Sequence, residues 1–485
     1  MTISAVNQTP SRGLAVPEVI QNLNFLCYFA RACSHLLAGW IPRFPDMDVK
    51  VNLGLHTYDD IRTASGLRGR LRIMTQLETT PQVDKRWVDL MAQADAVDKP
   101  EELFDFLYRH LKPMLKAATE TFVQETDAVA DHPSFVAASE LCRTLEAQLD
   151  WTRLCNYGLG RAPKALADAC GDVAAQRHVE TGLDWSESFL EVGARAPRVA
   201  RPDTMKPGFD GSFRSVVTDP IDDIEDIGKF LIAHLNDEWA TMELIARNSY
   251  EHTDMPWECH VDMLRQVADE ARHALVVLRL ATDLGMDYSE WPPLVLSYEA
   301  EYEFAPCDVG SRRELLWRIL IRQTFQEGMA IDSHSFEIER RNFAGQPEVA
   351  RVFEMILIDE TMHVRSGLKW SRYLVDGDEA KVQQEREEAH KYYVSELNQR
   401  RDTFVSTHPK QAMAELRALE EADRKREQLE PLPFELTHNM QYRRKLGYTD
   451  ADLSQVANWG YLPVEQGDGN EAQGQATGNA QLRDV

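Results

Sequence analysis

Apolar residues recur at spacings of three and four along most of the chain, and strict alternation of apolar and polar residues is rare. This periodicity is typical of amphipathic helices, whose apolar stripe faces a core. Glycine and proline are sparse inside the long periodic stretches and gather at 193–220. The pattern therefore predicts a nearly all-α chain, with four strong helices in 221–375 and several more in 21–185.

Changes in pattern and composition divide the sequence further. A charge-dense helical stretch follows the four strong helices, and the last residues are polar with almost no apolar side chains, which is typical of disorder. We expect an N-terminal arm at 1–20, a helical domain at 21–192, a linker at 193–220, a four-helix domain at 221–375, a C-terminal helical extension at 376–463 and a disordered tail at 464–485.

Composition narrows the possible functions. The chain has 485 residues and a net charge of −26, which argues against a nucleic-acid partner because phosphate binding needs clustered Lys and Arg. No apolar stretch is long enough for a membrane span, and no basic-then-apolar leader is present. The seven scattered cysteines form no CxxC pair, which favours reduced thiols in a cytoplasmic protein. The motifs of nucleophile-elbow hydrolases, P-loop NTPases and Rossmann enzymes are missing.

The most informative motif is ExxH. A glutamate and a histidine three residues apart lie on one face of a helix, so both can reach one metal ion. The sequence contains four such pairs, more than chance would give a chain with 14 histidines. They are Glu270/His273, Glu360/His363, Glu387/His390 and Glu435/His438.

Context separates these four pairs. Glu387/His390 is surrounded by charges, which indicates a solvated helix face. Glu435/His438 follows two prolines and is typical of a helix start, where a glutamate is favoured by the helix dipole. The other two pairs lie on apolar stripes, where a charged group is costly unless it is paired or bound to metal.

Each of these two pairs has a glutamate on the preceding helix. Glu238 and Glu327 lie on the core-facing stripes of the first and third helices, 32 and 33 residues before Glu270 and Glu360. Two helical hairpins of nearly equal length bring all these groups to one level. We expect two metal ions held by Glu238, Glu270, His273, Glu327, Glu360 and His363.

Several assignments stay open. Glu243 and Asp332 each follow the first ligand of a hairpin by five residues, as supporting residues or alternative ligands. His334, two turns beyond Glu327, is a possible seventh ligand, although a pocket or core histidine is the simpler interpretation. A buried polar network without metal would use the same residue types. We expect the substrate to enter beside Trp239, Phe325 and Phe336.

The N-terminal half repeats part of this pattern. Asp60 aligns with the glutamate of the first ExxH pair, but Thr63 replaces its histidine. Glu146 aligns with the glutamate of the second pair, but Leu149 replaces its histidine. The sequence therefore predicts a degenerate bundle without metal at 21–192. The alternative is that any two helical hairpins look alike at this level.

The strings DEARH (Asp269–His273) and DETMH (Asp359–His363) resemble the DExRH motif of bacterial di-iron monooxygenase hydroxylase subunits, with Met362 in place of the second arginine. The resemblance implies a ferritin-like four-helix bundle with a di-metal site. It further implies that Asp269 and Asp359 orient ligand histidines and that Arg272 stabilises the site.

A closer resemblance covers about 221–375. NDEWATMELIARN, DMPW, DEARH, QEGMAID and DETMH are similar, in this order, to a bacterial ferritin-like family related to the tRNA-modifying di-iron hydroxylase. This resemblance implies the fold and the metal more directly than it implies a reaction.

These observations predict a non-haem di-iron, oxygen-dependent oxidoreductase, a hydroxylase, desaturase or N-oxygenase, acting on a small organic substrate. Its cofactor is a pair of iron ions, or manganese with iron, and dioxygen is the co-substrate. Electrons come from an external donor such as a reductase or ferredoxin, and a homodimer is compatible with the pattern. The alternatives are ferritin- or rubrerythrin-like iron oxidation or peroxide scavenging, which the large extra half opposes, an RNA-modifying hydroxylase, which the net charge opposes, and a metal-free scaffold.

Overall fold

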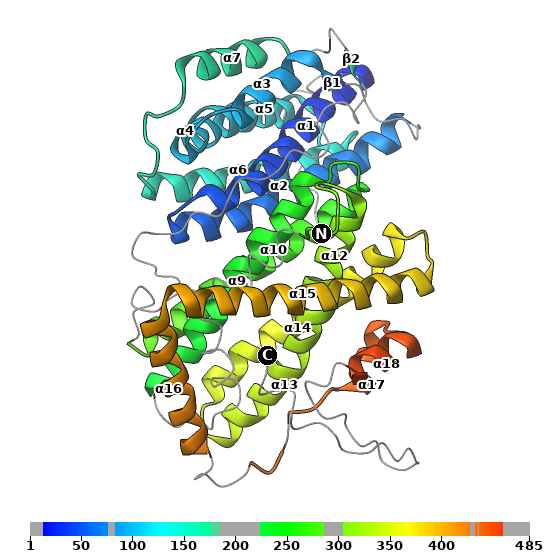
Figure 1. Ribbon diagram of the computed structural model, residues 1–485. Helices are drawn as coiled ribbons and strands as arrows, with labels where there is room; N and C mark the ends of the chain where they lie inside the picture. The colour runs from blue at the N-terminus through cyan, green and yellow to red at the C-terminus, as the bar shows by residue number, and fades with distance from the viewer. Residues whose placement is uncertain are drawn as a thin grey trace, which may run out of the picture. The chain divides into compact units, whose positions relative to one another are not determined.

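The computed structural model describes residues 13–75, 83–177, 179, 182–183, 224–285, 304–426, 432–434 and 436–458. These residues are almost entirely helical (Figure 1), so the prediction of an all-α chain is confirmed. Their only strands, β1 (Val83–Asp84) and β2 (Gly182–Leu183), pair antiparallel. The linker and tail expected at 193–220 and 464–485 lie outside the described residues.

The chain divides into two compact units. The first unit comprises Met1–Arg201 and Ile245–Ala268, and the second comprises Pro202–Leu244 and Asp269–Val485. Helices α9 (Ile224–Glu251) and α10 (Trp257–Asp283) therefore contribute residues to both units. The tip of this hairpin belongs to the first unit, where Tyr250 donates to Asp95 at 2.8 Å and Trp257 donates to Ser65 at 2.9 Å.

Two helical hairpins form the first unit's core. Helices α1 and α2 make one hairpin, α5 and α6 make the other, and the two pack on each other. Helix α1 is apolar on nearly all sides, and consequently most of its residues are buried. The bounds are α1 Val16–Trp40, η1 Ile41–Arg43, α2 Met47–Thr75, α3 Lys85–Asp95, α4 Pro100–Phe106, η2 Leu107–Leu111, α5 Lys112–Glu125, α6 His132–Leu154 and α7 Lys164–Ala175.

The expected N-terminal arm is shorter than 1–20, because α1 begins at Val16. Pro17 has the fixed backbone angle that suits a first helical turn, and the Glu18 carboxylate accepts a hydrogen bond from the Ala15 N–H at 2.8 Å. Residues 1–12 lie outside the described part of the chain.

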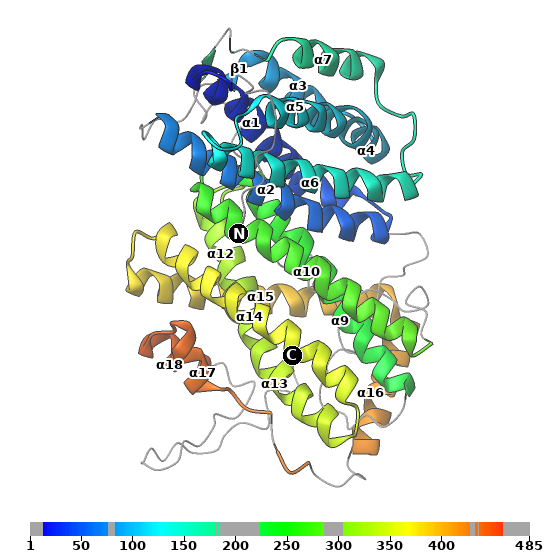
Figure 2. The ribbon, with the colours of Figure 1, turned by 180° about the vertical axis from the view of Figure 1, so that it is seen from behind.

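The second unit contains the metal-ligand candidates. Besides parts of α9 and α10, its elements are α12 Arg312–Ile319, η5 Leu320–Gln326, α13 Glu327–Phe343, α14 Pro347–Leu374, α15 Glu379–Thr407, α16 Pro409–Arg426, α17 Met440–Leu446 and α18 Asp450–Asn458. Helices α13 and α14 lie side by side as an antiparallel hairpin, seen from both sides in Figures 1 and 2. None of the helices in the described residues is long and apolar enough to cross a membrane.

Each unit contains one helix with a widened, π-helical turn. In the second unit, α12, η5 and α13 form one continuous helix whose turn at Leu320–Gln326 is widened. In the first unit, η2 (Leu107–Leu111) widens the helix formed by α4 and α5 in the same way. Both turns end immediately before a buried charged residue, Lys112 in the first unit and Glu327 in the second. Such turns are rare and occur frequently at functional sites.

Helix α14 approaches η5 closely at Gly367. A Cβ atom at this position would lie 2.7 Å from Gln323 Cβ and 3.1 Å from the Gln323 carbonyl carbon. We expect Gly367→Ala to destabilise the protein by about 1–3 kcal/mol through overpacking. Gly171→Ala, on α7 with no heavy atom within 4 Å of the added carbon, is the control and should be neutral or slightly stabilising. Thermal unfolding of the two variants measures this, and equal melting temperatures would contradict the close packing.

Candidate metal centre

Six buried side chains from four helical segments converge inside the second unit. Glu238 comes from α9, and Glu327 is the first residue after the widened turn. Helices α10 and α14 each contribute an ExxH pair, whose spacing turns glutamate and histidine to the same side. None of the six is more than 5% exposed. The structure thus brings together Glu238, Glu270, His273, Glu327, Glu360 and His363.

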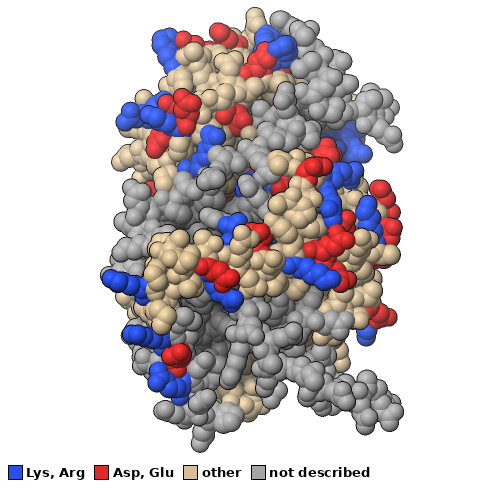
Figure 3. Space-filling view, viewed as in Figure 1, with Lys and Arg blue, Asp and Glu red and all other residues tan. Residues whose placement is uncertain are grey.

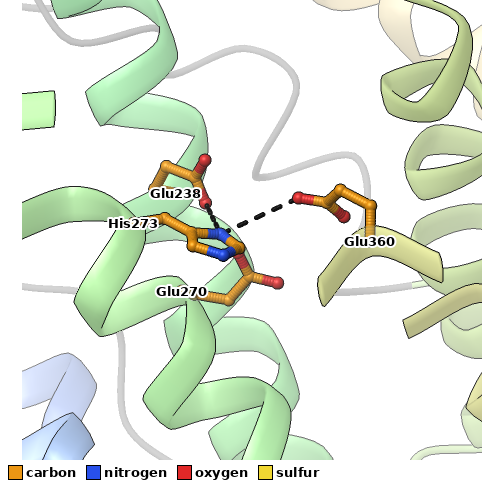
Figure 4. Close-up of side chains that lie close together, drawn as sticks. All are labelled: Glu238, Glu270, His273 and Glu360. Atoms are coloured by element: carbon orange, nitrogen blue, oxygen red, sulfur yellow. Dashed lines mark hydrogen bonds and ion pairs between the residues drawn. The ribbon is translucent and has the colours of Figure 1, made fainter. Parts of the chain in front are cut away.

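The first group consists of Glu238, Glu270, His273 and Glu360, whose ligand atoms all lie within 4.8 Å of one another. His273 Nδ1 lies 3.3 Å from Glu238 Oε2, 3.3 Å from Glu270 Oε2 and 3.8 Å from Glu360 Oε1. Figure 4 shows Glu360 pointing toward the His273 ring from a different side than Glu238. Three carboxylates and one imidazole nitrogen form a donor set that can hold a metal ion.

The second group consists of Glu270, Glu327 and His363, again within 4.8 Å. His363 Nδ1 lies 3.3 Å from Glu270 Oε1, 3.9 Å from Glu327 Oε2 and 3.1 Å from Glu360 Oε2. Glu270 and Glu360 therefore each turn one oxygen toward His273 and the other toward His363. This places both carboxylates between the two groups, while Glu238 and Glu327 serve one group each.

The aspartates that precede the ExxH glutamates act across the helix pair. Asp359 on α14 lies 3.2 Å from His273 Nε2 on α10, and Asp269 on α10 lies 3.4 Å from His363 Nε2 on α14. Arg272 contacts both aspartates. An aspartate that accepts the Nε2–H leaves the Nδ1 lone pair free for a metal. Each histidine thus directs Nδ1 inward and Nε2 toward a carboxylate of the opposite helix.

The buried charges strongly perturb one another. Burial, with added repulsion from neighbouring carboxylates, raises the pKa of Glu270 and of Glu360 well above the usual range. Burial also raises the pKa of Glu238, but the adjacent histidines outweigh it and hold that pKa well below the usual range. Burial lowers the pKa of His273 and of His363, yet the surrounding carboxylates raise both pKa values well above normal.

These shifts show that the donor set suits cations. Four glutamates carry four negative charges in a volume from which water is largely excluded, and the histidines are neutral when they act as ligands. Two divalent ions would balance this charge, whereas without metal the raised pKa values of Glu270, Glu360 and the two histidines favour their protonated forms. The residues present therefore fit a pair of divalent metal ions.

Three further candidate ligands lie outside the two ligand groups. Glu243 is fully buried on α9 but belongs to neither ligand group. Asp332 is not an alternative ligand, because His438 Nδ1 at 2.9 Å and the Asn439 N–H at 3.0 Å engage its two oxygens. His334 is buried beside the ring of His234, with 5.1 Å between centroids, and is also outside both groups.

The aromatic residues expected at a substrate entrance differ in burial and in their neighbours. Trp239 is fully buried on α9. Phe325 belongs to an apolar cluster with Trp317 and Tyr393, and its ring meets His390. Phe336 is half-buried and packs on Phe434 at 5.6 Å between centroids. A role for these three residues at a substrate entrance stays a prediction.

The two ExxH pairs set aside from the sequence lie apart from the centre. Glu387 is exposed and pairs with Lys391 at 2.6 Å, as expected for a solvated helix face, although His390 is half-buried. Glu435 lies outside the described residues, while His438 is buried against Asp332.

Sequence reasoning missed His234. Its Nε2 lies 2.8 Å from Glu238 Oε1, on the oxygen that does not face His273. It precedes Glu238 by one helical turn on the same apolar stripe, and this spacing was the available signal.

The first unit has a buried ion pair at the corresponding place. Lys112 Nζ donates to Asp60 Oδ2 at 2.6 Å and to Gln148 Oε1 at 2.5 Å, and Gln148 Nε2 donates to Asp60 Oδ1 at 3.0 Å. All three side chains are at most 1% exposed. Burial raises the pKa of Asp60, and the lysine opposes that effect. A lysine ammonium group here compensates a buried carboxylate.

The order of elements supports this correspondence. Lys112 and Glu327 each follow a widened turn and lie 215 residues apart, as do Gln148 on α6 and His363 on α14. The side chain facing the first unit's core is therefore Gln148. Leu149, which the sequence alignment placed there, is only half-buried, and Glu146 is exposed. An alignment of α6 with α14 by this spacing differs by one residue from the alignment made from the sequence.

The buried pair in the first unit gives a stability prediction. We expect Lys112→Met to destabilise this unit by about 3–5 kcal/mol, because it leaves the Asp60 carboxylate buried and uncompensated. The exposed Lys164–Asp168 pair, also 2.6 Å long, is the matched control, and Lys164→Met should cost less than about 1 kcal/mol. Urea unfolding followed by circular dichroism measures both, and similar small losses would contradict a stabilising ion pair.

The pKa shifts predict how the metal-free protein responds to pH. Glu270, Glu360, His273 and His363 have raised pKa values, so above about pH 4.3 the folded state binds more protons than the unfolded state. The stability that these four protonated groups contribute is fully present at lower pH. It is lost as the pH rises through their raised pKa values. Glu238 and Glu327 have lowered pKa values, so they change the stability of the protein only below about pH 4.3.

We therefore expect the melting temperature of chelator-treated protein to fall between about pH 5.5 and pH 8. The Glu270→Gln/Glu360→Gln variant should show a shallower fall, because it removes two of the titrating groups while keeping the shape of the site. Thermal unfolding across this range tests the expectation, and identical slopes for the two proteins would refute it.

Comparisons with known proteins add one finding. The family model described as "Protein of unknown function (DUF455)" matches residues 225–413. Neither the curated proteins nor the solved structures gave a match. The matched stretch contains all six clustered residues and ends within α16, so that α17 and α18 lie beyond it. Over these residues the chain is similar to that family.

Proposed function

We propose that this chain is a non-haem di-iron oxidoreductase that uses dioxygen to oxidise a small organic substrate. The observation that supports it best is the sharing of Glu270 and Glu360 between two histidines, each oxygen turned to a different Nδ1. One Glu and one ExxH pair per hairpin is the ligand pattern of ferritin-like di-iron proteins. We therefore assign α9, α10, α13 and α14 to a ferritin-like four-helix bundle.

Glu238 and His273 would hold one ion and Glu327 and His363 the other, with Glu270 and Glu360 between them. A bound iron pair supplies the redox chemistry for dioxygen activation. In a hydroxylation, one oxygen atom enters the substrate and the other leaves as water, with two electrons and two protons from an external donor. A manganese–iron pair would suit the same ligands.

The chain's own residues prepare this chemistry in three ways. Asp269 and Asp359 hold the Nε2 protons and so fix the orientation of the two imidazoles. The burial of all four glutamates excludes water from the centre. Glu270 and Glu360, whose pKa values are raised, release protons when cations bind, so that binding is favoured at higher pH.

Charge distribution bears on the RNA-modifying alternative. On the face shown in Figure 3, acidic and basic side chains of the described residues are interspersed along α15 and its surroundings. A nucleic-acid site requires clustered basic groups, and the net charge of −26 opposes one. A small substrate is therefore the better proposal.

Iron loading of the full chain tests the proposal. We expect two irons per chain, and dioxygen consumption after reduction by dithionite and removal of the excess. His273→Ala and Glu360→Ala should each bind fewer than two irons and lose oxygen consumption, while circular dichroism shows a retained helical fold. Glu387→Ala, the glutamate of the exposed ExxH pair on α15, is the matched control and should behave like the unaltered protein.

Two results would overturn the proposal. A chain that binds no metal under these conditions would favour the metal-free polar network. Iron oxidation without an organic product across a broad substrate panel, in a large multi-subunit assembly, would favour iron storage. The expected result is a stoichiometric di-iron centre with the Mössbauer quadrupole doublets of an iron pair.

A further inference from the structure

The segment 436–458, here called the C-terminal clamp, binds the backbone on both sides of Glu327. The Tyr448 hydroxyl donates to the Thr324 carbonyl oxygen at 2.9 Å, within the widened turn η5. Arg443 Nη2 donates to the Gly328 carbonyl oxygen at 2.5 Å, one residue after Glu327. Arg443 Nη1 also donates to the Tyr448 hydroxyl at 3.2 Å. The clamp therefore holds the chain three residues before and one residue after a candidate ligand.

Asp332 anchors the charged end of this contact. Arg443 Nη2 lies 2.5 Å from Asp332 Oδ2, and His438 Nδ1 lies 2.9 Å from the same oxygen. Arg443 and Asp332 are both buried, and a buried ion pair that loses one partner is strongly destabilised. The fold therefore keeps Arg443 in a fixed place, and its hydrogen bond to Gly328 is fixed with it.

The contact is close because Gly328 has no side chain. A Cβ atom there would lie 2.6 Å from Arg443 Nη1 and 2.8 Å from the Tyr448 hydroxyl oxygen. An alanine at 328 would therefore push both clamp side chains away from the helix. A widened turn does not follow the regular ladder of helical hydrogen bonds, and its buried carbonyls need other donors. The clamp supplies such a donor at Thr324.

A second set of contacts fixes the clamp elsewhere in the second unit. Asp452 accepts a hydrogen bond from Arg372 on α14 at 3.0 Å, and it also pairs with Arg386 on α15. Tyr448, Leu453 and neighbouring side chains share an apolar cluster with α13 and α14. Loss of the Tyr448 hydroxyl alone would consequently leave the clamp attached.

We propose that Tyr448 and Arg443 are positioning residues that hold the widened turn in the form that presents Glu327 to the second ligand group. This inference rests on the proposed di-metal function. The clamp's polar contacts described above are with η5, α13, α14 and α15, whereas Glu238 and His273 come from α9 and α10. The clamp therefore acts on the ion held by Glu327 and His363 rather than on both ions equally. It lies beyond the stretch matched by the family model, at residues 225–413.

Two variants test this role from opposite sides of the contact. Tyr448→Phe removes the hydroxyl, and Gly328→Ala displaces the clamp while raising helix propensity, which by itself would stabilise the helix. Titration of the full metal-free chain with Co(II), followed by its visible absorption, measures the two binding steps. We expect one ion to bind as in the unaltered chain and the other about 10–100-fold more weakly in both variants.

Tyr392→Phe is the control, because it removes a half-buried hydroxyl on α15 that accepts a hydrogen bond from the Ala305 N–H at 3.2 Å and not from the clamp or the widened turn. It should leave both binding steps unchanged. Amide hydrogen exchange of the metal-free proteins gives a second measurement that does not depend on metal. Exchange across residues 320–328 should be faster in Tyr448→Phe than in the unaltered chain or the control.

The outcomes separate the two proposals. Two unchanged binding steps in both variants, or an equal weakening of both ions, would overturn the positioning role and leave the di-metal function intact. An unaltered chain that binds no Co(II) would overturn the di-metal function. In that case hydrogen exchange alone tests whether Tyr448 holds the widened turn. Unchanged exchange across residues 320–328 in Tyr448→Phe would overturn that claim.

Discussion

Placing four carboxylates inside one helical core is the constraint on which the second unit depends. Carboxylates without compensation are costly in a buried environment, and here burial and mutual repulsion raise the pKa values of Glu270 and Glu360. The two histidines lie between these groups with Nδ1 inward, and Asp269 and Asp359 hold their outer nitrogens. The histidines offset part of the negative charge, and the two aspartates fix the rings with Nδ1 toward the glutamates. Cations bound between these groups would balance the charge of the four glutamates. The geometry therefore supports metal binding better than a closed polar network.

The first unit also buries a carboxylate, but it compensates that charge with its own side chains. Asp60 is as deeply buried as the glutamates, but Lys112 and Gln148 satisfy its oxygens directly. One ammonium group neutralises one carboxylate, so no further cation is required at that point. The lysine occupies the place after a widened turn that Glu327 occupies in the second unit. The residue after the widened turn thus carries a positive charge in the first unit and a negative charge in the second, whose core contains the candidate metal ligands.

Much of the centre followed from local patterns, and the remainder depended on distant ones. ExxH pairs on apolar stripes and hairpins of 32 and 33 residues indicated the six side chains, because helical periodicity fixes which residues share a face. The choice between the two roles left open for Asp332 could not be made from local pattern, because its partners, His438 and Arg443, lie 106 and 111 residues further along the chain. The one-residue difference in alignment at Glu146 arises because amphipathic helices align almost equally well in neighbouring registers. The widened turns have no compositional signature comparable to glycine or proline, so no local pattern predicted them.

The widened turns connect these observations. A widened turn changes the rotation, relative to the preceding stripe, of the residue that directly follows the turn. Glu327 occupies this position, and its neighbours Thr324 and Gly328 have carbonyl oxygens bound by Tyr448 and Arg443. A helix that departs from regular geometry needs stabilisation from outside the helix, and here it comes from residues more than 100 positions away. The ligand set of the second ion is therefore a property of the second unit's tertiary structure as well as of the QEGMAID sequence that contains Glu327.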